Sequence, residues 1–303
     1  MIIHGNCSEV LKDLDDDSID LVVTSPPYDN LREYKGYTFD FELVAKELFR
    51  VIKKGGVVVW VVNDSVINGG ESGTSFKQAL YFKDIGFNLH DTMIYHKSPL
   101  FQEKNRCPQS FEYMFVFSKG KPKTFNPIMD HKNKFDGHKG GELVTSVRKK
   151  NGKQTTKIRP KPREYSKRWN VWWIPNGYFK STMDKIAYEH PAIFPEKLAN
   201  DHIIMWSNEG DLVLDPFAGS GTTLKMAREL NRDYIGIEIS EEYIEIIKER
   251  LQIKDIDEKP KEPLKEESKD LCKICGATYT GMTYEEHKQR KFHQVVGLAR
   301  NNE

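Results

Sequence analysis

The stretch DLVLDPFAGSGTT, Asp211–Thr223, joins an apolar run to a turn that contains two glycines. DLVLD has the length and the branched side chains of a buried strand, and a helix is expected after the turn. Gly219 and Gly221 let the backbone turn sharply and approach a ligand closely, where a Cβ would clash. The stretch predicts a strand–turn–helix unit with a ligand at the turn, although a glycine-rich turn alone also fits a plain connection.

Strands alternate with helices along most of the chain. Apolar, β-branched runs predict strands at 2–3, 19–23, 57–62, 89–95, 113–117, 211–215 and 234–238. Apolar residues at helical spacing predict helices at 8–14, capped by Ser8, at 41–52, stopped by Lys53–Gly56, and at 75–85. The expected fold class is α/β, with a doubly wound and mostly parallel sheet.

Length and composition exclude several classes of protein. The 303 residues suggest two domains, or one large α/β domain with insertions. A formal net charge of +1 excludes a uniformly basic surface, and 38% hydrophobic residues exclude global disorder. Neither a signal peptide nor an apolar run of roughly 20 residues is present, and four cysteines are too few for a disulfide scaffold. We therefore expect a soluble, cytoplasmic protein with no membrane segment.

The charge is distributed unevenly. Between Lys119 and Arg168 there are 16 Lys and Arg residues against four acidic ones. Aromatic residues are interleaved with this run at Phe125, Phe135, Tyr165, Trp169, Trp172, Trp173 and Tyr178. Basic residues mixed with aromatics favour a polyanion partner, because they neutralise phosphates and stack on bases. A solvated face or a disordered basic loop is the alternative.

The second motif is Ser25-Pro26-Pro27-Tyr28, at the predicted carboxyl end of a buried strand. Two prolines cannot extend a central strand, but they fix a rigid turn whose carbonyls point outward as acceptors. Ser25 adds a small hydroxyl, and Tyr28 adds a flat aromatic face. Taken alone, the motif also fits a stiff loop.

Together, TSPPY and DPFAGSGTT resemble the catalytic and cofactor motifs of the DNA amino-methyltransferases that use S-adenosylmethionine. The catalytic motif comes first and a basic segment separates the two, which is similar to the β-class order. The resemblance covers about 1–118 and 186–254 and implies a Rossmann-like catalytic domain. It makes 119–185 a target-recognition insertion, followed by a charged linker at 255–270.

The resemblance also implies which residues bind the cofactor. IHGNC at 3–7 resembles the stretch that contacts the cofactor adenine, and HPAIFPEK at 190–197 resembles the element that closes over its methionine end. Glu238 ends the next strand, where a carboxylate accepts hydrogen bonds from ribose hydroxyls. The predicted cofactor-binding residues are Asn6, Cys7, His190, Pro191, Asp215, Pro216, Phe217, Gly219, Ser220, Gly221, Thr222, Thr223 and Glu238.

The chemistry agrees with this resemblance. An exocyclic amino nitrogen is a poor nucleophile, because its lone pair is conjugated with the ring. Hydrogen bonds to Ser25 Oγ and to the Pro26 carbonyl would favour a pyramidal nitrogen with a directed lone pair. Tyr28 would stack on a base flipped out of double-stranded DNA, and Pro27 would keep the turn rigid.

Serine at position 25 favours N4 of cytosine over N6 of adenine, because Ser-Pro-Pro is commoner among the family's cytosine enzymes. RNA or protein-glutamine methylation is a rival activity, and a catalytically silent DNA-binding module is a rival outside enzymes. The sequence leaves open a cognate restriction endonuclease as partner, and a monomer or a homodimer.

The residues at 271–303 contain four potential metal ligands with the spacing C-x2-C-x11-H-x5-H: Cys272, Cys275, His287 and His293. Two thiolates and two imidazoles can close a tetrahedral zinc site, and this segment is too short for an ordinary core. It resembles a C2H2 zinc finger, which implies a structural zinc ion. A chance arrangement of cysteines and surface histidines is the alternative.

Overall fold

The computed structural model describes residues 1–27, 40–98, 104–133, 144–158, 163–253, 270–271 and 278–279. The chain divides into two compact units, residues 1–256 and 257–303. In the second unit, β15 (Asp270–Leu271) pairs antiparallel with β16 (Thr278–Tyr279). Within the described ranges, no helix has the length and apolar character needed to cross a membrane.

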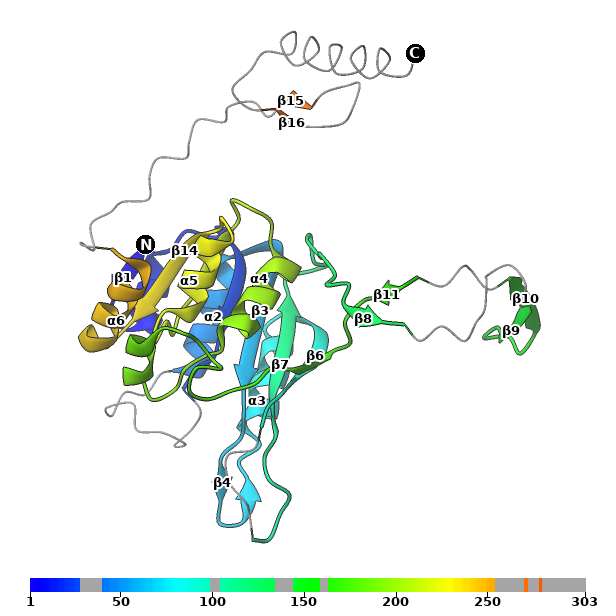
Figure 1. Cartoon of the computed structure of the whole chain (residues 1–303), viewed down its shortest axis with the longest axis horizontal. Helices are drawn as coiled ribbons and strands as arrows, with labels where there is room; N and C mark the ends of the chain where they lie inside the picture. Colours follow the sequence, from blue (N-terminus) through cyan, green and yellow to red (C-terminus); the bar gives the residue numbers. More distant parts are fainter. Residues whose placement is uncertain are drawn as a thin grey trace, which may run out of the picture. The chain divides into compact units, whose positions relative to one another are not determined.

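The first unit is built around an eight-stranded sheet in the order β1-β14-β13-β2-β3-β7-β6-β12 (Figure 1). β7 is antiparallel to its neighbours β3 and β6, and the other neighbouring pairs are parallel. Its strands are β1 (Ile2–His4), β2 (Ile19–Thr24), β3 (Ile52–Val62), β6 (Asn88–His96), β7 (Phe111–Ser118), β12 (Val171–Trp173), β13 (Leu212–Asp215) and β14 (Asp233–Glu238). The predicted doubly wound, mostly parallel α/β fold is confirmed.

Helices cover both faces of this sheet (Figure 1). They are α1 (Cys7–Val10), α2 (Phe41–Val51), α3 (Thr74–Asp84), α4 (Glu196–Trp206), α5 (Thr222–Glu229) and α6 (Glu241–Leu251), with short 3-10 turns at η1 (Leu11–Asp13) and η2 (Lys185–Glu189). Successive side chains of β2 point to opposite faces of the sheet. Val22 packs in the hydrophobic cluster that includes side chains of α2 and α3, and Val23 packs in the one that includes side chains of α4 and α5. Burial on both faces explains the continuous apolar runs in the strands.

Among the described residues of the first unit, three short antiparallel pairs lie outside the main sheet. They are β4 (Val66–Ile67) with β5 (Gly70–Glu71), β8 (His131–Lys132) with β11 (Tyr165–Ser166), and β9 (Val144–Arg148) with β10 (Gln154–Ile158). The last two belong to the predicted insertion at 119–185, and so does β12, which pairs with β6 as an edge strand of the main sheet. The insertion therefore contributes a strand to the central sheet, while its limits stay a prediction.

Two local predictions were wrong. The first helix is capped by Asn6 rather than Ser8, because Asn6 Oδ1 accepts a hydrogen bond from the Ser8 amide at 2.9 Å. The glycines at 55 and 56 do not stop a helix, since α2 ends at Val51 and β3 begins at the next residue. They lie inside β3, where Gly55 has a φ of +85° and the pairing with β2 shifts in register. At this position the glycine pair accompanies an irregularity within a strand and does not mark the end of a helix.

Candidate active site

A cavity of about 690 Å³ opens at the edge of the sheet where the parallel strands end. Residues that follow β1, β2, β3, β6, β12, β13 and β14 line it, together with Glu112 near the amino end of the antiparallel β7. This is where ligands bind in open α/β sheets, and the volume lies within the roughly 300–1,000 Å³ of ligand sites. Both sequence motifs contribute to the wall of this one cavity.

The glycine turn connects β13 to α5 and takes the left-handed conformations that its glycines predicted. Gly219 has a φ of +52°, and a Cβ there would lie 3.0 Å from His190 Nε2. Gly221 has a φ of +76°, and a Cβ there would lie 3.0 Å from two side-chain carbons of Ile247. Glycine is required at both positions, for backbone conformation and for space.

Glu238, at the end of β14, holds this turn in place. Its Oε2 accepts a hydrogen bond from the Gly219 amide at 2.7 Å, and its Oε1 accepts from the amides of Ile239 and Ser240 at 3.0 and 2.9 Å. Burial raises the pKa of the Glu238 carboxyl, and the three amides act against that rise. The carboxylate lines the cavity, and it also organises two backbone segments.

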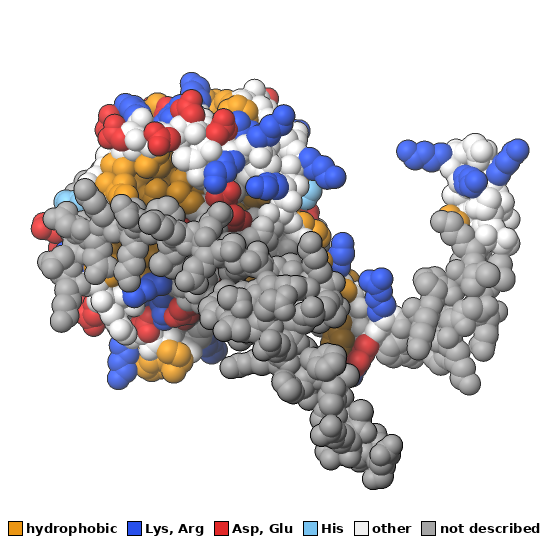
Figure 2. Space-filling model, turned by 90° about the horizontal axis from the view of Figure 1, so that it is seen from above, with side chains coloured by type: hydrophobic (Ala, Val, Ile, Leu, Met, Phe, Trp, Pro, Cys, Tyr) orange, Lys and Arg blue, Asp and Glu red, His pale blue; other side chains and the backbone are white. Residues whose placement is uncertain are grey.

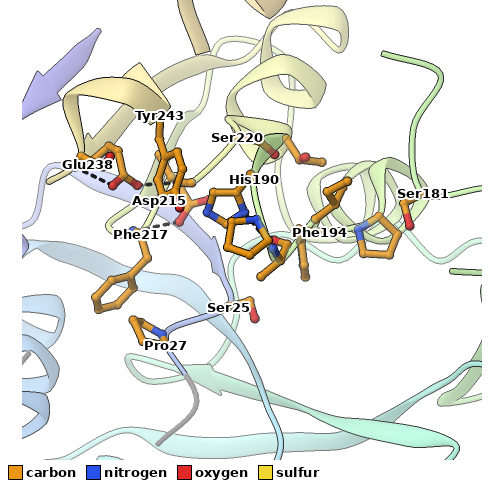
Figure 3. A pocket seen from close by; sticks show the side chains of 18 of the residues that line it. Ser25, Pro27, Ser181, His190, Phe194, Asp215, Phe217, Ser220, Glu238 and Tyr243 are labelled. Atoms are coloured by element: carbon orange, nitrogen blue, oxygen red, sulfur yellow. Dashed lines mark hydrogen bonds between the residues drawn. The ribbon is translucent and has the colours of Figure 1, made fainter. Parts of the chain in front are cut away.

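Asp215 ends β13 and lies in the cavity wall near His190 in Figure 3. Its Oδ1 accepts hydrogen bonds from the Thr24 hydroxyl at 2.6 Å and from the Phe217 amide at 3.1 Å. Burial raises the pKa of the Asp215 carboxyl to about 6, although hydrogen bonds to the carboxylate oppose the rise. A buried carboxylate with this pKa is suited to a cationic ligand, whose charge would offset the cost of desolvation.

The segment after η2 closes one side of the cavity. His190 Nδ1 lies 3.0 Å from the Ala192 carbonyl and 3.1 Å from its amide, and the His190 ring lies edge-on to Tyr243 at 4.3 Å between ring centres. His190 and Pro191 both line the cavity, as do Asn6 and Cys7 just after β1. Burial raises the pKa of the Cys7 thiol to about 12, so this cysteine is a neutral wall residue rather than a thiolate.

The Ser-Pro-Pro turn follows β2 on the other side of the cavity from Glu238 in Figure 3. Ser25 and Pro27 line the cavity, whereas Pro26 is buried and does not. Tyr28 lies outside the described residues. Two hydrogen bonds connect the Ser-Pro-Pro turn and its strand to the glycine turn. The Thr24 hydroxyl donates to Asp215, and the Thr223 hydroxyl donates to the Val23 carbonyl at 3.2 Å.

Most predicted cofactor residues thus share one cavity. Pro216, Phe217, Ser220 and Thr222 also line it, whereas Gly221 and Thr223 lie behind the wall and shape the turn. The sequence reasoning missed several wall residues: Asn63, Tyr95, Lys97, Glu112, Asn176, Tyr188 and Tyr243. For three of them the sequence contained a signal, which is their position relative to a parallel strand. Asn63 and Lys97 each follow the carboxyl end of such a strand, and Tyr95 lies at such an end.

A partly buried ion cluster behind the glycine turn was also missed. The Arg250 side chain is 0% exposed and donates to the Ser220 carbonyl at 2.6 Å. It pairs with Asp184 at 3.0 Å and with Glu196 at 2.8 Å, and Lys225 reaches the same two carboxylates at 2.8 Å each. The cluster connects α4, α5, α6 and the segment before η2, so it fixes the back of the turn.

The four predicted zinc ligands, Cys272, Cys275, His287 and His293, lie outside the described residues. In the ranges that the structure does describe, no three His, Cys, Asp or Glu side chains gather into a metal site. The zinc finger therefore stays a prediction.

S-adenosylmethionine fits the cavity by the chemistry of its wall. The sulfonium cation suits the buried Asp215 carboxylate. The nucleoside suits the space that the Glu238 carboxylate and the Tyr243 ring line. The close approach at Gly219, where a Cβ would meet His190, provides the narrow backbone cradle that such a ligand needs.

Comparison with known proteins agrees with this geometry. M.BamHII, an orphan methyltransferase from Bacillus amyloliquefaciens, is 59% identical over 244 residues, which cover 80% of this chain and 91% of that protein. The DNA adenine methyltransferase YhdJ from Escherichia coli is 31% identical over 275 residues, 83% of this chain and 82% of that protein. A solved protein from Thermus thermophilus, described as a DNA modification methylase and complexed with S-adenosyl-L-methionine, has a TM-score of 0.55 and 26% identity, over 82% of this chain and 91% of that one.

The family of DNA methylases that modify N6 or N4 amino groups matches residues 19–249, which contain both motifs and the segment between them. The match extends over more than half of the chain and agrees with the shared cavity. The chain belongs to this family of DNA amino-methyltransferases.

Proposed function

We propose that the protein transfers a methyl group from S-adenosylmethionine to the exocyclic amino group of a base flipped out of double-stranded DNA, with N4 of cytosine as the favoured target. The observation that carries the proposal is the shared cavity, which Ser25 and Pro27 line together with Gly219 and Glu238. An amino acceptor and a bound cofactor there would lie close enough for direct transfer.

On the base side, the protein holds the amino group. Ser25 Oγ and the Pro26 carbonyl accept its two N–H groups, and Tyr28 stacks on the base. When bound, S-adenosylmethionine supplies an electrophilic methyl group on a positively charged sulfonium. Asp215 and Glu238 offset that charge and hold the glycine turn, so the contribution of the protein is mainly positioning and electrostatics.

The choice of cytosine rests on Ser25 as the first residue of the motif, which resembles the cytosine enzymes of the family. N6 of adenine is the second candidate, favoured by the likeness to YhdJ, whose name states adenine. Both bases present an amino group beside a ring nitrogen, so the same acceptors serve either one.

Contact with DNA is supported by the basic segment at 119–185. On the β9–β10 hairpin Arg148, Lys149, Lys150 and Lys153 are exposed, and no acidic residue occurs between 144 and 158. Figure 2 shows Lys and Arg side chains standing out from this hairpin. Exposed aromatic rings in the same segment include Trp169, Trp173 and Tyr178, at 66%, 56% and 61%. Such a surface neutralises phosphates and stacks on unpaired bases.

We further propose that Cys272, Cys275, His287 and His293 bind one structural zinc ion in a small C-terminal finger. Lys288, Arg290 and Lys291 in the same segment suit phosphate contact.

The decisive experiment is to express the protein in a host without DNA methylation and to sequence the host DNA for modified bases. We expect one modified base, N4-methylcytosine, at one short sequence, and far less of it with Ser25→Ala. N6-methyladenine would replace the favoured target by the second candidate. DNA without modification, from a folded protein that binds S-adenosylmethionine, would contradict the proposal.

A further inference from the structure

One wall of the cavity is polar and has no part in the function proposed above. Tyr95, Lys97 and Glu112 come from the carboxyl end of β6 and the amino end of β7, where Tyr95 lies opposite Glu112 in the pairing register. Lys97 and Glu112 form an ion pair, and their side chains are 17% and 13% exposed. Each of these two charged groups therefore already has a partner of opposite charge at the cavity edge.

Tyr95 differs from this pair, because its polar atom is buried without a partner. Five buried side-chain polar atoms in the described part of the chain lack a hydrogen-bond partner, and two of them, Tyr95 Oη and Asn176 Oδ1, belong to residues that line this cavity. The Tyr95 residue is 2% exposed. A buried hydroxyl without a partner destabilises a protein, so its position in a ligand cavity indicates that a ligand completes it.

The hydroxyl has an unused O–H donor. Burial, followed by the charge of Glu112, raises the pKa of the Tyr95 phenol, so the O–H group keeps its proton at any assay pH. The Glu112 carboxylate, whose charge acts on this pKa, is already paired with Lys97. A ligand that places a hydrogen-bond acceptor here would satisfy the unused O–H group.

The position of Tyr95 suits the base rather than the cofactor. Ser25 follows β2 and Tyr95 lies at the end of β6, with β3 and β7 between them. Strands are about 4.8 Å apart, so the two backbones are separated by roughly 14 Å across the sheet, which leaves room for a base between the two side chains. The glycine turn and Glu238 lie on the other side of β2, on β13 and β14.

We infer that the Tyr95 hydroxyl donates a hydrogen bond to the ring nitrogen next to the amino group of the flipped base. This ring nitrogen is N3 in cytosine and N1 in adenine, and the acceptor chemistry is the same in both. Tyr95 is then a specificity-determining residue, because it selects bases in which a ring acceptor adjoins the amino group. The inference rests on the proposed function.

The test combines a protein change with a base change. Tyr95→Phe removes the hydroxyl and preserves the ring. In a duplex with the sequence found in the host DNA, the target base is replaced by its analogue with carbon in place of that nitrogen: 3-deazacytosine for a cytosine target, 1-deazaadenine for an adenine target. Methyl transfer is measured for both proteins on both duplexes. Tyr113→Phe, on the neighbouring strand β7 and outside the cavity lining, is the matched control.

We expect Tyr95→Phe to lower kcat/KM on the natural duplex about tenfold, the size of one lost hydrogen bond. The analogue should lower the wild-type value by a similar factor and have little further effect in Tyr95→Phe, because both changes remove the same bond. Cofactor affinity should be unchanged, and the melting temperature equal or higher, since an unpartnered buried hydroxyl is lost. Tyr113→Phe should keep the full sensitivity to the analogue.

Two results would overturn the role of Tyr95. One is wild-type methylation of the analogue at the rate of the natural base. The other is a pair of losses that multiply, so that Tyr95→Phe remains as sensitive to the analogue as the wild type. Either result leaves the proposed function intact, because the wild-type enzyme still methylates the natural duplex. A wild-type protein that methylates no duplex overturns both proposals.

Discussion

The Glu238 carboxylate accepts a hydrogen bond from the Gly219 amide across 2.7 Å, which links the end of β14 to the glycine turn after β13. Gly219 holds a φ of +52°, and a Cβ there would lie only 3.0 Å from His190 Nε2. One carboxylate thus shapes the turn and lines the cavity. We therefore expect cofactor binding and turn geometry to respond together when Glu238 is changed.

Glu238→Ala would leave the amides of Gly219, Ile239 and Ser240 without their acceptor. We expect S-adenosylmethionine to bind about 10- to 100-fold more weakly and the melting temperature to fall. Calorimetric titration and thermal denaturation measure the two effects. Glu241→Ala, which changes an exposed neighbour, is the control. Wild-type affinity in Glu238→Ala would refute this assignment.

The raised pKa of Asp215 predicts how stability depends on pH. The carboxyl titrates at about 6 in the folded protein, against about 3.9 in an unfolded chain. Between these values the folded state binds a proton that the unfolded state lacks, so this group lowers stability by up to about 3 kcal/mol as pH rises from about 4 to 6. Compared with the wild type, Asp215→Asn should gain stability over this window and keep a constant advantage above it. Denaturant unfolding at several pH values measures this difference. If the unfolding free energies of the wild type and Asp215→Asn depend on pH in the same way, the assignment is contradicted.

The same carboxylate predicts the opposite trend for the cofactor. A cationic ligand favours ionised Asp215, so affinity for S-adenosylmethionine should fall as pH drops below about 6. S-adenosylhomocysteine, which lacks the sulfonium charge, should show a smaller fall. Asp215→Asn should bind S-adenosylmethionine more weakly above pH 6 and with less pH dependence. Equal pH dependence for the two ligands would show that Asp215 does not sense the sulfonium.

Features that depend on short sequence patterns were predictable. The glycine turn was found because two glycines follow a buried strand. The structure places both motifs at one cavity, because parallel strands end at one edge of a sheet. Gly55 and Gly56 were misread, because a glycine pair after a helix is also compatible with an irregular strand. Arg250 gave no signal, since its role depends on Asp184 and Glu196, which only tertiary packing brings together.

The Arg250 cluster gives a further prediction. Arg250→Met would leave two carboxylates with Lys225 as their cation and would remove the donor to the Ser220 carbonyl. Breaking a fully buried ion pair costs about 3–5 kcal/mol, but Asp184 and Glu196 are 30% and 21% exposed, so we expect a smaller loss of unfolding free energy, together with weaker cofactor binding. Arg250→Lys keeps the charge and should recover part of the stability. Denaturant unfolding and calorimetry test both variants, and a fully stable Arg250→Met would contradict the role of the cluster.

Substitutions of two adjacent residues with hydroxyl groups, Thr24 and Ser25, should affect cofactor binding and the chemical step separately. Thr24 donates to Asp215, whereas Ser25 lines the cavity. Thr24→Val should raise the KM for S-adenosylmethionine and change kcat little. Ser25→Ala should lower kcat by about a hundredfold and leave cofactor affinity unchanged, because the contact it removes matters in the transition state. Steady-state kinetics in both substrates measure the split, and an unaltered kcat in Ser25→Ala would show that the turn is a rigid loop without a catalytic role.

The C-terminal segment gives the last prediction. Truncation after Ile253 removes the predicted linker and finger but leaves both motifs and α6. The truncated protein should keep its affinity for S-adenosylmethionine and its target base, because the whole cavity lies upstream. The full chain should contain about one zinc ion, and Cys272→Ser should abolish it. Without Lys288, Arg290 and Lys291, DNA binding should weaken and depend less steeply on salt, because fewer counterions are released. Metal analysis and DNA titrations at several salt concentrations test this division. A full chain without zinc would refute the finger, and a truncated enzyme with a different target base would show that the tail takes part in base choice.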